Sequence, residues 1–321
     1  MPSSVQCAAR ALERAAPARD IAMADPTDDR EHRGNLLIGI PKKGRLHEKC
    51  MQLVEGAGLD HKRPDRVDVA HCNNMPVTLV FLPAADIATY VGEGNVDMGI
   101  TGLDVIEETI PPEEVNREID LHFGRCRLAV QAPVKNNITD VSTLAGKRIV
   151  TSFPNLAKKF FAKYETEATG KTKIKFVSGS VEAACGLGLA DAVVDLVETG
   201  TTMRAAGLDV VATIMETESV LITNPNSTHK EILETIKQRI MGYLTATKYS
   251  MIQYNVHTDN LKKACDITPG KRSCTVSHLA SDGWCAVSAL VLRKDQAVIM
   301  DKLEKVGADS ILIFKIDNSR M

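Results

Sequence analysis

The chain has 321 residues, of which 44% are hydrophobic and 25% are charged, and its formal net charge at pH 7 is −2. These values are typical of a soluble globular protein, and this charge gives no general attraction to nucleic acid or to an anionic membrane. No apolar run in the sequence approaches the roughly 18 residues that a membrane-spanning helix needs. We therefore expect a cytoplasmic protein of two or three domains, in which any site for an anion is built locally.

The spacing of the cysteines and the composition of residues 1–34 bear on the cellular compartment and on metal binding. The eight cysteines lie singly, without a CxxC pair or a His/Cys cluster of zinc spacing, which favours reduced thiols over a structural metal. Residues 1–34 are rich in Ala, Arg and Pro without a clean period, which predicts a disordered extension. An organelle transit peptide is the alternative, because the first twelve residues carry Arg10 and no acid, although acids follow at Glu13 and Asp20.

From Leu36 onward, short apolar runs alternate with stretches of helical pattern. Such alternation predicts α/β layers around mainly parallel sheets, in which ligands lie beyond the carboxyl ends of the strands. The expected strands are 36–40, 77–82, 97–100, 128–130, 147–151, 174–177 and 192–196, with helices at 155–167 and 180–189. The turns that best suit a ligand are 41–46, 101–102 and 198–203.

The last part of the chain has a different order of elements. A long helix over 228–247 is expected to act as a spacer. The elements after it follow the order βαββαβ, which is the ferredoxin-like arrangement and spans about 70 residues. The expected strands are 250–256, 274–279, 284–292 and 310–316, and the expected helices are 260–265 and 296–306.

The strongest candidate for chemistry is the segment Asp195–Met203, which reads DLVETGTTM. A strand delivers two acids, Asp195 and Glu198, and a loop of Thr199, Gly200, Thr201 and Thr202 then opens a helix. The backbone N–H groups and hydroxyls of such a loop can bind one phosphate, and a helix amino terminus favours its negative charge. An acid just upstream can accept hydrogen bonds from ribose hydroxyls. The segment therefore predicts a ribose-5-phosphate site; a plain turn with a threonine cap is the alternative.

A basic turn follows the first expected strand. Lys42, Lys43, Gly44 and Arg45 place positive charge at the end of that strand, which suits a pyrophosphate or a triphosphate. Arg66 is a weaker candidate for the same task. A solvated surface turn is the alternative for all of these residues.

Two further turns are candidate ligand contacts. Thr101 and Gly102 end the glycine-rich segment Val91–Gly102, most of which we interpret as architecture. Glu182 opens an expected helix after Gly179, and could bind a ribose hydroxyl or a magnesium-bound phosphate. An ordinary acid in the first turn of a helix is the alternative for Glu182.

Taken together, these segments resemble the ATP phosphoribosyltransferase family in its long, histidine-regulated form. The resemblance covers Asn35–Met321 and is closest in texture to fungal-type members. The segments that carry it are 41–46, 82–87, 91–102, 148–157, 179–182, 195–208 and the C-terminal run 267–308.

The resemblance implies a fold and a division into domains. The fold is a two-lobed, periplasmic-binding-protein-like α/β catalytic core followed by a ferredoxin-like (ACT-like) regulatory domain. Lobe I would comprise residues 35–126 and 220–244, lobe II residues 127–219, and the regulatory domain residues 245–321. A homo-oligomer is also implied, a hexamer built from dimers.

The resemblance further implies an activity and its participants. ATP and 5-phosphoribosyl-1-pyrophosphate would give N1-(5-phosphoribosyl)-ATP and pyrophosphate, with Mg²⁺ carried by the substrate and L-histidine as feedback inhibitor. Catalytic roles would fall to Lys43, Arg45, Glu182 and Asp195. Substrate would be bound by Gly44, Arg66, Thr101, Gly102, Asp195, Glu198, Thr199, Gly200, Thr201 and Thr202.

The regulatory histidine would lie near Asn255, Thr275, Leu290 and Ser310. Asn255 stands where some bacterial members have an aspartate, so it offers histidine an amide oxygen without a charge. Ordinary core or loop positions are the alternative for these four residues.

The competing class of function is a non-catalytic binding protein or regulatory subunit with the same fold. Two lobes and glycine-rich turns would serve such a protein equally well. The acids and the threonine loop, together with the basic turn, favour an enzyme, because a binder of a simple solute would not need both.

Overall fold

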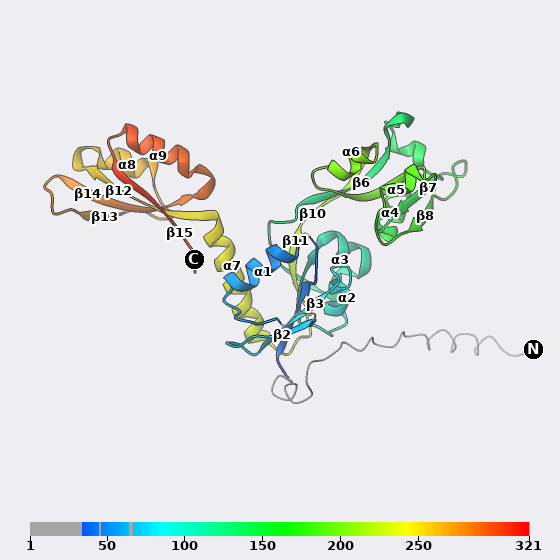
Figure 1. Ribbon diagram of the computed structural model, residues 1–321, viewed down its shortest axis with the longest axis horizontal. Helices are drawn as coiled ribbons and strands as arrows, with labels where there is room; N and C mark the ends of the chain where they lie inside the picture. Colours follow the sequence, from blue (N-terminus) through cyan, green and yellow to red (C-terminus); the bar gives the residue numbers. More distant parts are fainter. Residues whose placement is uncertain (1–33, 45, 64–66, 321) are drawn as a thin grey trace, which may run out of the picture.

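The computed structural model describes residues 34–44, 46–63 and 67–320. In this part of the chain, three units each surround their own sheet, and a long helix connects the first unit to the third (Figure 1). Except for Gly34, the extension expected over residues 1–34 lies outside the described residues.

Lobe I contains a six-stranded sheet of order β2-β3-β1-β4-β11-β5. Its strands are β1 (Leu36–Pro41), β2 (Val69–His71), β3 (Val77–Leu82), β4 (Met98–Gly102), β5 (Asn116–Asp120) and β11 (Ser219–Thr223). Its helices are α1 (His47–Gly56), α2 (Ile87–Gly92), α3 (Leu103–Thr109) and α7 (Lys230–Lys248).

Both faces of this sheet are covered. Leu53 of α1 and Ile236 of α7 pack against one face, whereas Ile87 of α2 and Ile106 of α3 belong to the core on the other. Every residue of β3 is therefore buried, and five of the six residues of this strand are apolar, the exception being Thr78.

Lobe II contains a five-stranded sheet of order β10-β6-β9-β7-β8. Its strands are β6 (Cys126–Pro133), β7 (Arg148–Thr151), β8 (Lys173–Phe176), β9 (Ala192–Val197) and β10 (Leu208–Thr217). Its helices are α4 (Pro154–Phe161), α5 (Ala183–Gly186) and α6 (Thr201–Ala205). Phe161 of α4 packs in one core of this lobe, and Ala184 of α5 and Met203 of α6 pack in the other.

The two sheets are mixed rather than mainly parallel, which corrects the expectation from the sequence. β1 runs parallel to β3 and β4, and β7 runs parallel to β8 and β9. In contrast, β11 is antiparallel to β4 and β5, and β6 is antiparallel to β9 and β10. The chain enters lobe II through β6 and re-enters lobe I through β11, and these two entering strands run opposite to the parallel ones.

The two helices expected in lobe II are also shorter than the sequence pattern indicated. α4 ends at Phe161, and α5 comprises only Ala183–Gly186. Beyond α4, the hydroxyls of Thr166 and Thr169 accept hydrogen bonds from each other's backbone N–H groups at 3.2 and 2.9 Å. Such local bonds offer the backbone an alternative to helix.

The regulatory unit has a four-stranded sheet of order β13-β14-β12-β15 and the predicted βαββαβ sequence of elements. Its strands are β12 (Tyr249–His257), β13 (Thr275–His278), β14 (Trp284–Leu292) and β15 (Asp309–Lys315), and its helices are α8 (Leu261–Ile267) and α9 (Gln296–Lys305). Tyr254 is fully buried in the core beneath the helices, where its hydroxyl lies 2.7 Å from the hydroxyl of Thr268.

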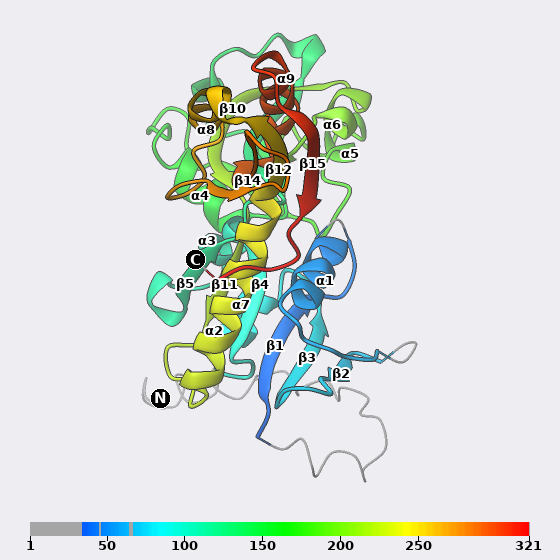
Figure 2. The ribbon, with the colours of Figure 1, turned by 90° about the vertical axis from the view of Figure 1, so that its left-hand side faces the viewer.

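The residues after β15 return to lobe I and lie beside α7 and α1 (Figure 2). The side-chain amide of Asn318 donates to the carbonyl of Gly56 at 2.8 Å, and the hydroxyl of Ser319 donates to that of Gly242 at 3.1 Å. The regulatory unit is therefore connected to lobe I both through α7 and through its carboxyl-terminal segment. None of the helices in the described part of the chain is both long and apolar enough to cross a membrane.

An ion pair at the start of β7 gives lobe II a pH dependence. The guanidinium of Arg148 lies 2.8 Å from the carboxylate of Asp191 and lowers its pKa from 3.8 to about 2. The pKa is lower in the folded state, so the stabilisation is present above about pH 4 and is lost as the pH falls through about 2. We expect Arg148→Met to lower the stability only slightly at neutral pH, because both side chains are more than a third exposed to solvent.

Urea denaturation between pH 7 and pH 2 measures this effect. The difference between wild type and Arg148→Met should shrink below about pH 4. Lys173→Met, on the neighbouring position of β8, is the matched control and should show no such trend. A cost of Arg148→Met that is constant across this range would contradict the assignment.

Candidate functional site

The parallel strands of each lobe end at the edge that faces the other lobe. Ser219, the first residue of β11, pairs with Gly102 at the carboxyl end of β4, so the chain enters lobe I at that edge. Arg127 of β6 pairs with Val197 at the carboxyl end of β9, so the chain enters lobe II at the corresponding edge. The turns after β1, β3 and β4 therefore face those after β7, β8 and β9 across the crossover between the lobes (Figure 1).

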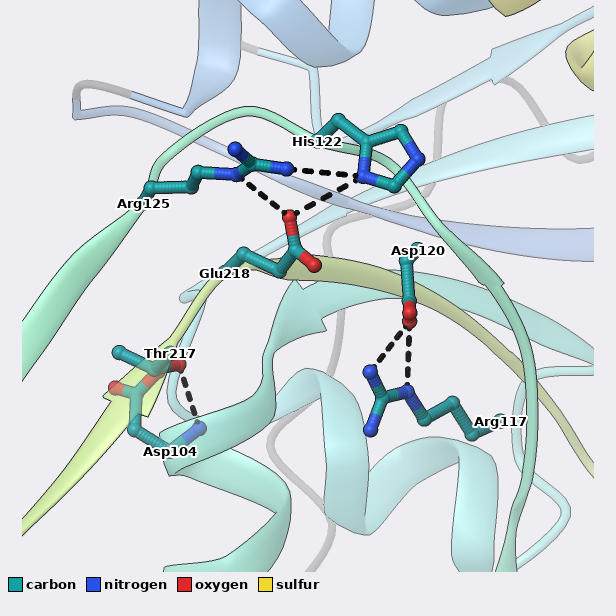
Figure 3. A network of polar contacts seen from close by, with 7 residues as sticks. All are labelled: Asp104, Arg117, Asp120, His122, Arg125, Thr217 and Glu218. Atoms are coloured by element: carbon teal, nitrogen blue, oxygen red, sulfur yellow. Dashed lines mark hydrogen bonds and ion pairs between the residues drawn. The ribbon is translucent and has the colours of Figure 1, made fainter.

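Polar contacts hold the crossover segments together (Figure 3). The carboxylate of Glu218 accepts from Nε of Arg125 at 3.1 Å and lies 3.5 Å from Nδ1 of His122. Nearby, the hydroxyl of Thr217 in lobe II donates to the carboxylate of Asp104 in lobe I at 2.6 Å. These two carboxylates connect the end of β10 to α3 and to the segment that precedes β6. We call this group of contacts at the crossover between the lobes the hinge.

The loop after β9 leads directly into a helix, α6, as the sequence pattern predicted. Gly200 is left-handed with φ of 72° and stands at the amino terminus of α6. The hydroxyls of Thr199 and Thr201 lie 3.0 Å apart, and both side chains are exposed, as are those of Glu198 and Thr202. Several hydroxyl and N–H donors are therefore close together at the open edge of lobe II.

Asp195 lies on β9, just before this loop. One of its carboxylate oxygens accepts from the backbone N–H of Leu196 at 2.8 Å, and its backbone carbonyl accepts from the buried amide of Gln131 at 3.2 Å. These bonds fix the strand from which the loop begins. Glu182 lies on the neighbouring turn after β8, where it precedes α5 and is half-buried.

The basic turn lies on the opposite side, at the carboxyl end of β1. Lys42 and Lys43 are exposed, and Nζ of Lys42 lies 2.6 Å from the carboxylate of Asp68. Gly44 is left-handed, with φ of 92°. Lys43 therefore presents its charge at the edge of lobe I. The predicted residues Arg45 and Arg66 lie outside the described residues.

Thr101 and Gly102 end β4 at the same edge. The side chain of Thr101 is fully buried, and its hydroxyl donates to the carbonyl of Ala84 at 3.2 Å. Gly102 precedes α3, and a Cβ at this position would lie 2.3 Å from the carboxylate of Asp104. The hydroxyl of Thr101 is thus already hydrogen-bonded within lobe I. The absence of a side chain at Gly102 leaves space for the carboxylate of Asp104.

Comparison with known proteins decides the family. A family model described as ATP phosphoribosyltransferase matches residues 83–242, and one described as the HisG C-terminal domain matches residues 246–318. The ATP phosphoribosyltransferase of Yarrowia lipolytica is 50% identical over 89% of this chain and 97% of its own length. That of Saccharomyces cerevisiae is 47% identical over the same shares. The chain belongs to the ATP phosphoribosyltransferase family.

A solved structure supports the assignment to this family. A chain of the ATP phosphoribosyl transferase (HisG:HisZ) complex from Thermotoga maritima is similar with a TM-score of 0.55 and 27% identity. The likeness covers 64% of the present chain and 98% of that one. The family confirms the predicted fold class, a two-lobed, periplasmic-binding-protein-like core with a regulatory domain. It also confirms the predicted enzyme class, a pentosyltransferase of histidine biosynthesis.

Three of the four residues expected near a regulatory histidine lie on the same face of the sheet β13-β14-β12-β15. Thr275 pairs with Ser288, Asn255 with Ala286, and Leu290 with Met251. This is the face opposite α8 and α9, since the alternate residues Tyr254 and Val287 are buried beneath the helices. Ser310 lies on β15 near a register shift and has φ of 49°.

Three residues at the site had no role in the sequence prediction. Arg204 folds over the loop after β9 and donates to the carbonyl of Thr199 at 2.8 Å. Asp68 neutralises part of the basic turn, and the buried Gln131 supports Asp195. Arg204 lies one turn beyond the loop in sequence, so helical spacing was the one available signal for it.

Proposed function

We propose that the facing edges of the two lobes form the site that transfers a phosphoribosyl group from 5-phosphoribosyl-1-pyrophosphate to N1 of the adenine of ATP. The lone pair of N1 forms a bond with the anomeric carbon, and the bond from that carbon to the pyrophosphate oxygen breaks with its electron pair. N1 already carries a free lone pair, so no base is needed to expose it. Catalysis then rests on positioning and on charge stabilisation.

The loop after β9 is proposed to bind the donor. The N–H groups and hydroxyls of Thr199, Gly200, Thr201 and Thr202 would hold the 5-phosphate, a role that the left-handed Gly200 and the exposed hydroxyls support. The carboxylates of Asp195 and Glu198 would accept hydrogen bonds from the ribose hydroxyls. The anomeric carbon would then face lobe I.

The basic turn after β1 is proposed to stabilise the leaving pyrophosphate. Lys43 supplies positive charge at the facing edge, and Arg45 and Arg66 are proposed to act with it, as are the backbones of Gly44 and Thr101–Gly102. Among the described residues, no group of three or more His, Cys, Asp or Glu side chains could hold a metal ion. Mg²⁺ enters this proposal as part of the pyrophosphate substrate, and Glu182 is proposed to help hold the ribose or the magnesium.

One observation carries the proposal. The phosphate loop and the basic turn follow parallel strands of two different sheets, and both lie at the edges that the crossover brings to face each other. A donor with a phosphate at one end and a pyrophosphate at the other suits this separation of the two sites.

We further propose that L-histidine inhibits the enzyme by binding the open face of the regulatory sheet, near Asn255, Thr275, Leu290 and Ser310. The support is the common face of the first three residues and its position outside the helix-covered core. A hexamer assembled from dimers belongs to this proposal, because an open sheet face can be completed by another copy.

The test is formation of phosphoribosyl-ATP by the purified chain from both substrates with Mg²⁺, with and without L-histidine. Turnover that histidine suppresses would support both the transfer and the regulation. Turnover that histidine leaves unchanged would overturn the regulatory part alone. Folded protein without turnover would favour the alternative, a binding protein or regulatory subunit without catalysis.

Replacing Asp195 by asparagine tests the ribose contact. We expect kcat/KM to fall about 30-fold, because an amide replaces a charged acceptor at the reacting sugar. The isosteric change should leave the urea midpoint close to that of wild type. The control is Asp209→Asn on the exposed start of β10, and equal activity of the two variants would rule out the contact.

A further inference from the structure

A buried carboxylate of lobe I contacts the backbone of lobe II. Glu108, near the end of α3, is only 9% exposed. Its carboxylate accepts from the backbone N–H of Asn155 at 2.8 Å and from that of Leu156 at 2.9 Å, both in the first turn of α4. In return, the side-chain amide of Asn155 donates to the backbone carbonyl of Glu108 at 3.0 Å.

The amino terminus of α4 needs such a partner. The first N–H groups of a helix have no acceptor within it, and Phe153, at the capping position, provides no side-chain bond. Pro154 at the first position has no N–H, so the next two residues carry the unpaired donors. Glu108 satisfies both, and its charge is favoured at the positive end of the helix. Lobe I thus caps a helix of lobe II.

The position of this cap matters for the facing edges of the two lobes. α3 begins directly after Gly102 at the edge of lobe I, and α4 begins shortly after the carboxyl end of β7 at the edge of lobe II. The hinge contact between Asp104 and Thr217 lies four residues before Glu108, about 6 Å along the same helix. A hinge alone permits rotation, whereas a second attachment away from it fixes the angle between the lobes.

We propose that Glu108 is a positioning residue, which holds the two lobes at the angle at which the phosphate loop and the basic turn reach one substrate molecule. The inference rests on the proposed function for its effect on activity. Glu108 contacts backbone groups of lobe II and not the substrate, so its loss leaves the reacting groups in place. In a variant without this contact, substrate binding must also fix the angle between the lobes. This cost weakens the apparent affinity for the ligand that contacts both lobes.

Steady-state kinetics of three variants test the positioning role. Glu108→Ala should raise the KM for 5-phosphoribosyl-1-pyrophosphate about tenfold and change kcat less than about threefold. Glu107→Ala is the matched control, because it removes the same charge from the exposed side of the same helix and should behave as wild type. Glu108→Gln keeps an acceptor oxygen and should recover most of the affinity. A KM of Glu108→Ala within twofold of that of Glu107→Ala would overturn the proposal.

Hydrogen exchange measures the contact without reference to activity. In Glu108→Ala, amide exchange in the segment containing Asn155 and Leu156 should be at least tenfold faster than in Glu107→Ala, with the strands of both lobes still protected. Unchanged exchange there would contradict the cap itself. If the wild type shows no turnover but exchange in Glu108→Ala is still faster than in Glu107→Ala, the cap is supported and only the proposed reaction is rejected.

Discussion

Replacing Gly200 by alanine is expected to lower kcat/KM about 100-fold, because the phosphate loop can no longer adopt its conformation. Gly200 has φ of 72°, and an added Cβ would lie 2.7 Å from the guanidinium of Arg204. An L-residue in the left-handed region costs about 1–2 kcal/mol, which the loop can relieve only by moving its N–H groups. Displacement of donors by about 1 Å is enough for a loss of this size. The measurement is steady-state turnover with both substrates.

Gly207 offers a matched control for this substitution. It is also left-handed, with φ of 70°, but a Cβ there would meet nothing within 4 Å, and it lies beyond the far end of α6. Gly207→Ala should therefore show a similar loss of stability with turnover within about twofold of wild type. Equal activity in the two variants would mean that the loop does not bind the phosphate.

Replacing Gly56 by valine is expected to lower the free energy of unfolding by about 2–3 kcal/mol through overpacking. Gly56 ends α1 where that helix meets α7, and a Cβ at this position would lie 2.1 Å from the ring of Tyr243. Its carbonyl also accepts from Asn318 of the carboxyl-terminal segment. The two helices cannot separate without disturbing the core of lobe I. Urea denaturation of the variant measures the cost.

A second substitution identifies the cause of this cost. Adding Tyr243→Ala to Gly56→Val should restore part of the stability, because the smaller side chain makes room for the valine. Gly186→Val, where an added Cβ meets nothing within 4 Å, controls for valine in a helix and should change stability little. A double variant less stable than Gly56→Val alone would show that the ring is not the obstacle.

The elements of the core could be predicted from the sequence where the apolar pattern is simple. β1, β3 and β14 lie within one residue of their predicted bounds, because each is an almost continuous apolar run. The start of a helix directly after the loop at Gly200 could also be predicted, because threonine and glycine after a strand are typical of a turn that leads into a helix.

The crossing of the chain between the lobes could not be predicted in the same way. β10 and β11 run opposite to their neighbours, and no local pattern encodes the direction in which a strand joins a sheet. The contacts of Glu108 with α4 and of Arg204 with its loop depend on tertiary approach, so their residues look like ordinary surface charges in the sequence. Conversely, Thr101 fits a ligand turn by sequence, but its hydroxyl is bonded within lobe I.

The most direct test of the central claim, that the donor binds between the lobes, is hydrogen exchange of the wild type with 5-phosphoribosyl-1-pyrophosphate and Mg²⁺. Bound donor should slow exchange in residues 198–203 of lobe II and in residues 42–46 of lobe I at the same substrate concentration. A hollow of about 580 Å³ lies along α7, where Lys230, Gln238 and Arg320 contribute to its lining. Slower exchange confined to that hollow, or to one lobe alone, would contradict a donor site shared by the two lobes.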